Sequence, residues 1–287
     1  MNRTSTDPSD ESQQDASATQ VDRVLDILEV LARSPRPQLL GEVAAAVGAS
    51  KPTTHRLLAT LVRRGYASQD PDAGEYRIGV RCFELGSLWA ANLDLRQLAA
   101  PHLRQLNTST QETVHLAIYD HGDAVYVDKL ESPLPVIASS FVGRRCPASC
   151  VATGRVLLAY QPDRELGRVL GEPLPRFTDA TITEPAALRD LLDEVRQTGV
   201  GVNHGSYRDG VGGVAVAVRD RTGIVVASVG VCLPEMRFPA DRFAALRDEV
   251  AAAGHAISAD LGYVEPLGVS GAANPAAAGS PQAGAVW

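Results

Sequence analysis

The spacing of apolar residues predicts three helices before Gly65. Residues 21–31 carry them at i, i+3, i+4 and i+7, the pattern of an amphipathic helix: Val21, Val24, Leu25, Leu28 and Leu31. A second, shorter helix is expected to pack through Leu40, Val43, Ala44 and Val47 and to end at Gly48. The third has its buried stripe at Thr54, Leu57, Leu58 and Leu61. Three such helices can close one small core.

Local signals mark both ends of the third helix. Ser50 is a good N-cap, and Pro52 is tolerated in the first turn because the first amides of a helix lack internal partners. Gly65 can take the left-handed conformation that ends the helix. Two short runs, 66–68 and 76–78, then flank a turn-rich segment and predict a two-stranded wing. The order of elements indicates a winged helix-turn-helix, which is mostly α and lays its third helix in the DNA major groove.

The polar face of the third helix, together with the wing, supplies candidate DNA contacts. Lys51, Arg56 and Arg77 are expected to hold phosphates, and residues 53–56 to lie nearest the base edges. The full set of candidates is Ser50, Lys51, Thr53, Thr54, His55, Arg56, Thr60, Arg63, Tyr76 and Arg77. Exposed basic residues can also form a merely solvated face. However, the whole chain has a net charge of −7 while residues 38–66 are locally basic, which favours a polyanionic partner.

An apolar segment separates this DNA-binding domain, called the head below, from the rest of the chain. Residues 81–95 predict a linker helix whose apolar side chains need a partner: Phe83, Leu85, Leu88, Trp89 and Leu93. The expected organisation is a disordered tail at 1–18, a DNA-binding domain at 19–80, the linker at 81–95, a second domain at 96–265 and a disordered tail at 266–287. The linker helix could instead pack only on its own chain.

The second domain has the pattern of an α+β fold. Strands are predicted at 113–119, 124–130, 136–141, 200–203, 213–219 and 224–232. Helices are predicted at 94–107, 151–160, 164–170, 185–197 and 240–261. Mostly antiparallel strands with helices on their faces are typical of α+β domains.

Several ordered motifs resemble one known family. They are Val21–Leu28, Ser50–Leu58, Gly65-Tyr66, Tyr76–Gly79, Glu84–Gly86, Glu112–Ala117, Val125–Lys129, Val142-Gly143 and Gly154 ahead of Leu157–Ala159. At this spacing they are similar to the IclR family of bacterial transcription regulators over residues 19–264. The resemblance implies a GAF-like effector domain with a small-molecule pocket. It also implies a homodimer or tetramer that binds double-stranded operator DNA.

The resemblance places an effector pocket where this chain departs from its relatives. Where family members carry acids, a cysteine and two serines, this chain has Asn203, His204, Gly213, Gly230 and Cys232. Glycine removes bulk and hydrogen-bond donors, so a roomier pocket, less suited to a small carboxylate, is expected. The candidate effector-binding residues are Cys150, Thr153, Gly154, Asn203, His204, Tyr207, Gly213, Gly230 and Cys232. The Thr153-Gly154 amides at a helix start offer an anion site.

Composition narrows the function further. The 287 residues are 45% hydrophobic, enough for two cores, and four cysteines do not form a disulfide framework. Neither a membrane span nor a signal peptide is apparent, so a soluble cytoplasmic protein without membrane partners is expected.

The expected function is a ligand-responsive transcription repressor, with no enzymatic activity, metal or cofactor. An activator of the same construction remains an alternative. A different class also remains open: a DNA-binding protein whose second domain is a thiol or metal enzyme, given Cys146 and Cys150 beside Arg144 and Arg145.

Overall fold

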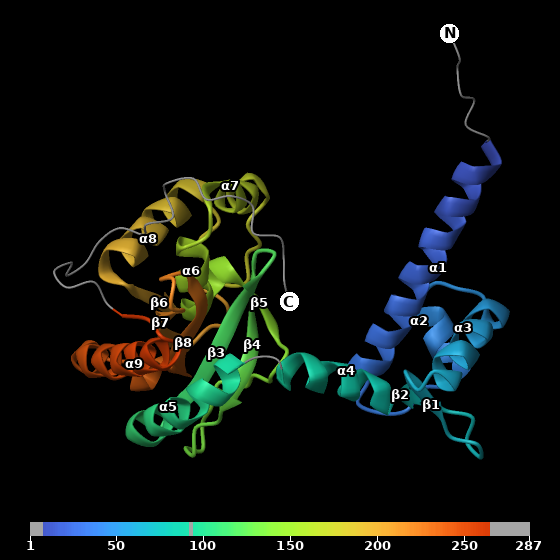
Figure 1. The fold of residues 1–287 in the computed structure, drawn as a ribbon, viewed down its shortest axis with the longest axis horizontal. Coiled ribbons are helices and arrows are strands. Elements are labelled where there is room, and N and C mark those ends of the chain that lie inside the picture. Colours follow the sequence, from blue (N-terminus) through green and yellow to red (C-terminus); the bar gives the residue numbers. More distant parts are fainter. Residues whose placement is uncertain (1–7, 92–93, 265–287) are drawn as a thin grey trace, which may run out of the picture. The chain divides into compact units, whose positions relative to one another are not determined.

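The computed structural model describes residues 8–91 and 94–264. The chain divides into two compact units, one ending at Leu93 and one beginning at Asp94 (Figure 1). Each unit has its own hydrophobic core and is described by itself.

The first unit is a winged helix-turn-helix, as predicted. Its elements are α1 (Pro8–Arg33), α2 (Leu40–Ala46), α3 (Lys51–Arg63), β1 (Ala67–Gln69), β2 (Tyr76–Ile78) and α4 (Val80–Ala91). Ile27 of α1, Val43 of α2 and Leu58 of α3 are fully buried and meet in one core. The two wing strands pair antiparallel, with Ser68 opposite Arg77. The fold of this unit therefore agrees with the prediction from apolar spacing, helix-end residues and turn residues.

The first helix differs from its prediction. It begins at Pro8, so residues 8–18, expected to be a disordered tail, are helical; Glu, Gln and Ala in this stretch are good helix formers. Ile27 and Leu31 form the buried stripe, whereas Val21 and Leu25 are more than half exposed. Residues 1–7 and the predicted tail at 266–287 lie outside the described residues. So do residues 92–93 of the predicted linker, whose described part is α4 and the start of α5 (Asp94–Thr110).

The second unit is built on a six-stranded antiparallel sheet in the order β5-β4-β3-β8-β7-β6. The strands are β3 (Thr113–Asp120), β4 (Asp123–Leu130), β5 (Arg145–Pro147), β6 (Val200–His204), β7 (Val211–Arg219) and β8 (Val225–Pro234). The central pair is β3 and β8, with His115 opposite Gly230. This is the α+β class expected from the sequence.

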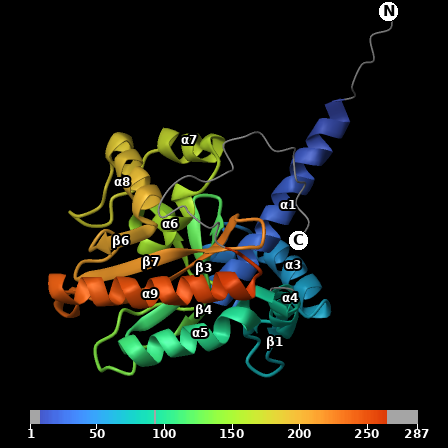
Figure 2. The same ribbon diagram turned by 60° about the vertical axis from the view of Figure 1, so that its left-hand side comes forward.

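Helices cover both faces of the sheet. On one face, α5 and α9 (Ala240–Asp260) pack on the alternating valines of β7 and β8. Figure 2 shows α9 lying along the sheet beside α5. On the other face lie α6 (Ala152–Ala159), α7 (Asp163–Gly171) and α8 (Pro185–Thr198). The sheet is therefore the middle layer of three.

One predicted strand is absent from its place. Residues 136–141 form a loop, and the edge strand is β5 instead. Pro133 and Pro135 precede the segment and cannot donate to a ladder. Its carbonyl groups bond to side chains: Lys129 Nζ donates to Ser140 O at 2.9 Å, and Arg237 to Val136 O at 2.9 Å. We call residues 132–141 the strap.

Small residues let α6 lie close to the sheet. A Cβ atom on Gly201 would lie 2.6 Å from the carbonyl oxygen of Ala152, and one on Gly213 would lie 2.9 Å from that of Val231. At Gly230 a Cβ atom would lie 2.6 Å from the Cβ of Ala215. Real Cβ atoms do not tolerate separations of 2.6 Å, so Gly201 allows α6 to approach the sheet, whereas Gly213 and Gly230 make room for the neighbouring strands β8 and β7.

Candidate nucleic-acid interface and small-molecule pocket

The start of α3 is fixed by Ser50. Its hydroxyl lies 2.9 Å from the Thr53 hydroxyl and accepts a bond from the Thr53 amide at 3.4 Å. Its carbonyl oxygen accepts from the Thr54 amide at 2.9 Å. Pro52 lies in the first turn, as predicted, where its missing amide hydrogen costs nothing. The cap holds the first turn and thereby the polar face that follows.

That polar face is solvent-exposed and cationic. The predicted residues Lys51, His55, Arg56, Thr60 and Arg63 are all exposed on α3, and Thr53 is half-buried beside them. Among the side chains described in residues 20–86, no carboxylate lies within 4.0 Å of the Lys51, Arg56 or Arg63 cationic groups. Cations without an internal counter-ion are free to bind phosphate.

Two predicted DNA contacts are corrected by burial. Thr54 has no exposed surface, because its hydroxyl turns inward and donates to Ser50 O at 3.0 Å. Tyr76 is 3% exposed and packs in the head core, where its backbone pairs with Gln38. Both residues therefore support the exposed face of α3 from the core of the first unit and do not contact DNA themselves.

The wing is shaped by its turn and by the end of α3. The Asp70 carboxylate accepts from the Ala73 and Asp72 amides at 2.9 Å each, and these bonds hold its pKa below the ordinary value. Gly65 follows α3 at φ +78°. These features present Arg77 on the exposed side of β2.

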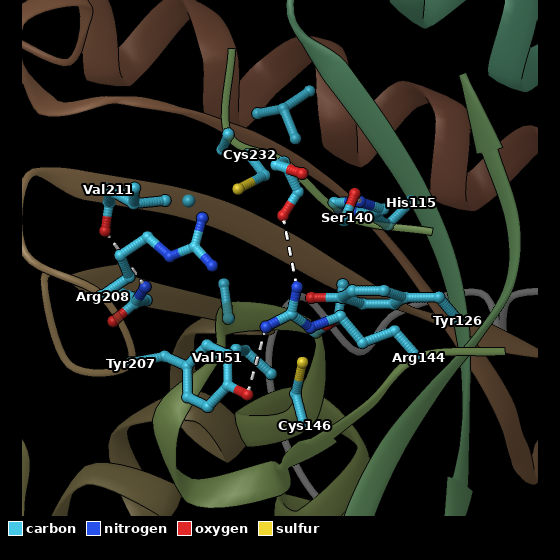
Figure 3. Close-up of a pocket in the computed structure, with 18 residues that line it drawn as sticks. His115, Tyr126, Ser140, Arg144, Cys146, Val151, Tyr207, Arg208, Val211 and Cys232 are labelled. Carbon is cyan, nitrogen blue, oxygen red and sulfur yellow. Dashed lines mark hydrogen bonds between the residues drawn. The ribbon is translucent and has the colours of Figure 1, made fainter. Parts of the chain in front are cut away.

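A small cavity lies in the second unit between the start of α6, the strap and the sheet (Figure 3). The space that the centres of water-sized spheres can occupy is about 60 Å³. At roughly 10–15 Å³ for each water, this holds about four to six water molecules. Its lining includes two arginines, Arg144 and Arg208, and no aspartate or glutamate.

Arg144 is the central cation of this cavity. Its guanidinium donates to the Ser139 carbonyl and to the Tyr207 hydroxyl, both at a long 3.4 Å. It also lies 5.5 Å from the centre of the Tyr207 ring. The Tyr207 bond raises the pKa of Arg144, so the group is cationic. No carboxylate of the described residues lies within 4.0 Å of it.

His115 is an uncharged part of the cavity lining. Its ring stacks on Tyr126 at 4.0 Å between centroids, and Nε2 lies 2.7 Å from the Ser140 hydroxyl. Burial, and to a lesser degree the charges of Lys129 and Arg144, lower the pKa of His115 to about 3. The imidazole is therefore uncharged near neutral pH.

An unpaired hydroxyl completes the polar lining. Thr153 is 5% exposed, and its Oγ1 has no hydrogen-bond partner among the described residues. It lies in the first turn of α6, where amides lack internal partners and favour anions. A buried unpaired hydroxyl is costly unless something else bonds to it.

The predicted effector residues divide into two groups. Thr153, Asn203, Tyr207, Gly213 and Cys232 line the cavity. The other four do not line it: Cys150, Gly154, His204 and Gly230.

Packing explains why those four lie elsewhere. Cys150 is buried beside Ser149, and a Cβ on Gly154 would lie 2.5 Å from Ala148. His204 is exposed and stacks on Phe238 at 4.9 Å. Gly230 meets Ala215, so its missing side chain does not enlarge the cavity. The expectation of a roomier pocket from glycine replacement is thus wrong at Gly230.

Sequence reasoning missed most of the charged and aromatic lining. His115, Tyr126, Ser140, Arg144 and Arg208 come from β3, β4, the strap and two loops. The paired arginines Arg144-Arg145 were visible in the sequence but were weighed only as neighbours of Cys146. The structure separates them, because Arg145 pairs with Asp120 at 2.6 Å while Arg144 turns into the cavity.

The thiols and metal-ligand types do not form a reactive centre in the described part of the chain. Burial raises the pKa of Cys146 and Cys150, and that of Cys232 to about 12. No group of three or more His, Cys, Asp and Glu residues within 8–91 and 94–264 could hold a metal ion. Among the described helices, none is both long and apolar enough to cross a membrane.

Comparison with known proteins gives consistent matches over both units. Residues 20–71 match the IclR helix-turn-helix domain, and residues 88–259 match the domain described as bacterial transcriptional regulator IclR C-terminal. The chain is 34% identical over 244 residues to the HTH-type transcriptional regulator XynR of Escherichia coli, covering 85% of this chain and 97% of XynR. It is 30% identical over 246 residues to the HTH-type transcriptional repressor AllR of Klebsiella pneumoniae, covering 85% of this chain and 90% of AllR.

One of the similar solved structures contains a bound small molecule. It is an IclR homologue from Microbacterium hydrocarbonoxydans complexed with 4-hydroxybenzoate. The TM-score is 0.75 at 27% identity, over 84% of this chain and 98% of the homologue.

Proposed function

This chain belongs to the IclR family of bacterial transcriptional regulators, and on that premise we propose that it is a repressor whose hold on operator DNA is set by a small anionic effector. We assign DNA binding to residues 19–80, effector binding and oligomerisation to 96–265, and their connection to the helix between. AllR, a related protein, is named as a repressor, which favours repression over activation. Such a regulator acts where the bacterial chromosome lies, in the cytoplasm.

The face of α3 that carries unpaired cationic side chains binds DNA in this proposal. Lys51 and Arg56 are exposed and have no carboxylate nearby in the described head, so nothing internal competes with DNA for them. A helix laid in the major groove brings its first turns to the base edges. Arg56 and His55 then face bases, while Lys51 and the wing residue Arg77 hold phosphates.

The effector site is the cavity around Arg144. A guanidinium with only two long bonds, an unpaired Thr153 hydroxyl and the start of α6 together favour a negatively charged oxygen group. The relative solved with 4-hydroxybenzoate carries a carboxylate ligand, which supports the same chemistry here. The sequence expectation of a pocket ill-suited to a small carboxylate did not include Arg144.

Two heads are needed to read paired half-sites, and α4 offers a surface for pairing. Val80 and Phe83, three residues apart on one side of α4, are 66% and 74% exposed. Adjacent apolar side chains in water favour association. We therefore propose a homodimer through α4, which can assemble further into a tetramer.

Effector binding is proposed to act through the strap. Arg144 holds the strap by the Ser139 carbonyl, and His115 holds it by the Ser140 hydroxyl. An anion that takes over the Arg144 donors removes one of these bonds and favours a different strap position. A ligand changes operator affinity only if it binds one arrangement better than the other.

The observation that carries the proposal is the exposed cationic face of α3 within an IclR head. Its test is selection of operator sites from random duplex DNA by the full-length protein at moderate salt. Enrichment of a two-fold symmetric site is expected, as two equivalent heads require. Recovery of unrelated sequences after repeated rounds would contradict sequence-specific regulation.

A further inference from the structure

The effector cavity contains a second cation besides Arg144. Arg208 follows β6 in the loop before β7, and its guanidinium lines the same cavity. Figure 3 shows its side chain directed toward the interior beside Cys232, while Arg144 enters from the strap side. Among the described residues Arg208 forms no ion pair within 4.0 Å. Two guanidinium groups thus face one space.

No group in the cavity supplies the matching negative charge. The lining contains no aspartate or glutamate. Its remaining acids are thiols and phenols, and burial raises the pKa of Cys146, of Tyr126 and of Cys232, the last to about 12. These groups are neutral near pH 7. Lys129, behind the strap, is already paired with Glu131 at 2.8 Å.

Hydrogen bonds to Ser206 hold the loop that carries Arg208. Arg155 is 4% exposed and donates to the Ser206 hydroxyl at 2.9 Å, and the Asn203 side chain accepts from the Ser206 amide at 3.0 Å. Thr181 donates to the Ser206 carbonyl at 2.7 Å. These bonds fix the loop backbone two positions before Arg208, whose side chain lines the cavity and is also exposed to solvent.

From the two uncompensated guanidinium groups, we propose that Arg208 makes this regulator select a compact effector with two anionic groups, such as a short dicarboxylate, over one with a single charge. One carboxylate binds Arg144 and the first turn of α6, and the other binds Arg208. This rests on the proposed function, since it names the charge of the effector for the same site. A space of about four to six waters suits an aliphatic diacid of about three to six carbons.

The test uses pairs of probes that differ in one charge and little in size. Full-length protein is titrated calorimetrically with succinate and succinamate, and with glutarate and glutaramate. The wild type is expected to bind one diacid roughly 10- to 100-fold more tightly than its monoamide, since a charge-assisted bond replaces a neutral one. Arg208→Gln should remove that preference, because the diacid loses a charge-assisted bond and the monoamide only a neutral one. The matched control, Arg189→Gln, replaces an exposed arginine of α8 outside the cavity and should retain it.

The possible results distinguish a failure of the diacid proposal from a failure of the proposed regulatory function. Equal binding of diacid and monoamide, or a preference that persists in Arg208→Gln, would overturn the role of Arg208 while leaving a single-charge effector site at Arg144. Absence of binding by malonate, succinate, glutarate and adipate alike would overturn the short-diacid class. In either case operator selection by the head still decides whether the chain is a DNA-binding regulator.

Discussion

Protonation of His115 should make the second unit sensitive to mild acid. The side chain is 2% exposed, stacked on Tyr126, and bordered by the cations Lys129 and Arg144. Its pKa is about 3 in the fold, against an ordinary value of 6.5. Folding therefore favours the neutral form, and the unfolded chain binds the proton more readily.

The direction and size of the effect follow from these two values. The contribution is fully present above pH 6.5 and is lost as the pH falls from 6.5 toward 3. Between pH 7 and pH 5 the unfolded chain gains about 0.7 of a proton at this histidine that the folded chain does not. At about 1.4 kcal/mol for each pH unit below 6.5, the loss in free energy of unfolding is about 2 kcal/mol.

The assay compares His115→Gln with the wild type. Urea unfolding is measured at pH 7 and pH 5 at one protein concentration, by pulse proteolysis read from peptides of residues 94–264. Carboxylates titrate alike in both proteins, so the difference between them isolates His115. The wild type should lose about 2 kcal/mol more than the variant, and the exposed-residue control His255→Gln should behave as the wild type. If His115→Gln loses as much stability as the wild type, the buried neutral imidazole is refuted.

Two further predictions concern charged groups of opposite burial. Glu112 is fully buried and accepts from Arg237 at 2.7 Å and Arg242 at 2.9 Å. Glu112→Gln should therefore lower the free energy of unfolding by about 3 kcal/mol in the same proteolysis assay. A loss below about 1 kcal/mol, the range expected for the exposed control Glu131→Gln, would contradict this prediction. Lys51 is exposed on α3, and Lys51→Gln should weaken binding to all DNA sequences and reduce the slope of log K against log salt by about one. Fluorescence anisotropy from 50 to 200 mM salt measures that slope, and an unchanged value would remove Lys51 from the phosphate contacts.

The head could be predicted from sequence because its signals are local. Ser50, Pro52 and Gly65 mark α3 within a few residues of its ends, and each acts through its own backbone geometry. Thr54 was predicted both for the buried stripe of the third helix and as a DNA contact, and its burial confirms only the first; Tyr76 was chosen by its chemistry without its orientation. A polar side chain on the buried side of a helix satisfies itself on the backbone, as Thr54 does with Ser50.

The cavity could not be predicted in the same way, because its charges meet across the fold. His115 on β3, Arg144 after the strap and Arg208 before β7 approach only when β3 and β8 pair and α6 closes one face. Residues 136–141 illustrate the same limit: their apolar pattern suits a strand, but the carbonyl of Ser140 bonds to Lys129, a side chain rather than a neighbouring strand. Gly230 was predicted to be an effector-binding position, but the structure shows that a glycine is needed there because Ala215 of the neighbouring strand lies too close for a side chain.

The central claim is that α3 reads DNA sequence, and Arg56→Ala on a selected operator tests it most directly. The matched control is Arg189→Ala, which removes the same charge from α8 in the second unit. At moderate salt, Arg56→Ala should weaken operator binding by about 1 to 3 kcal/mol and narrow the gap between operator and scrambled DNA, while the control binds as the wild type does. Normal, sequence-selective binding by Arg56→Ala would contradict the account.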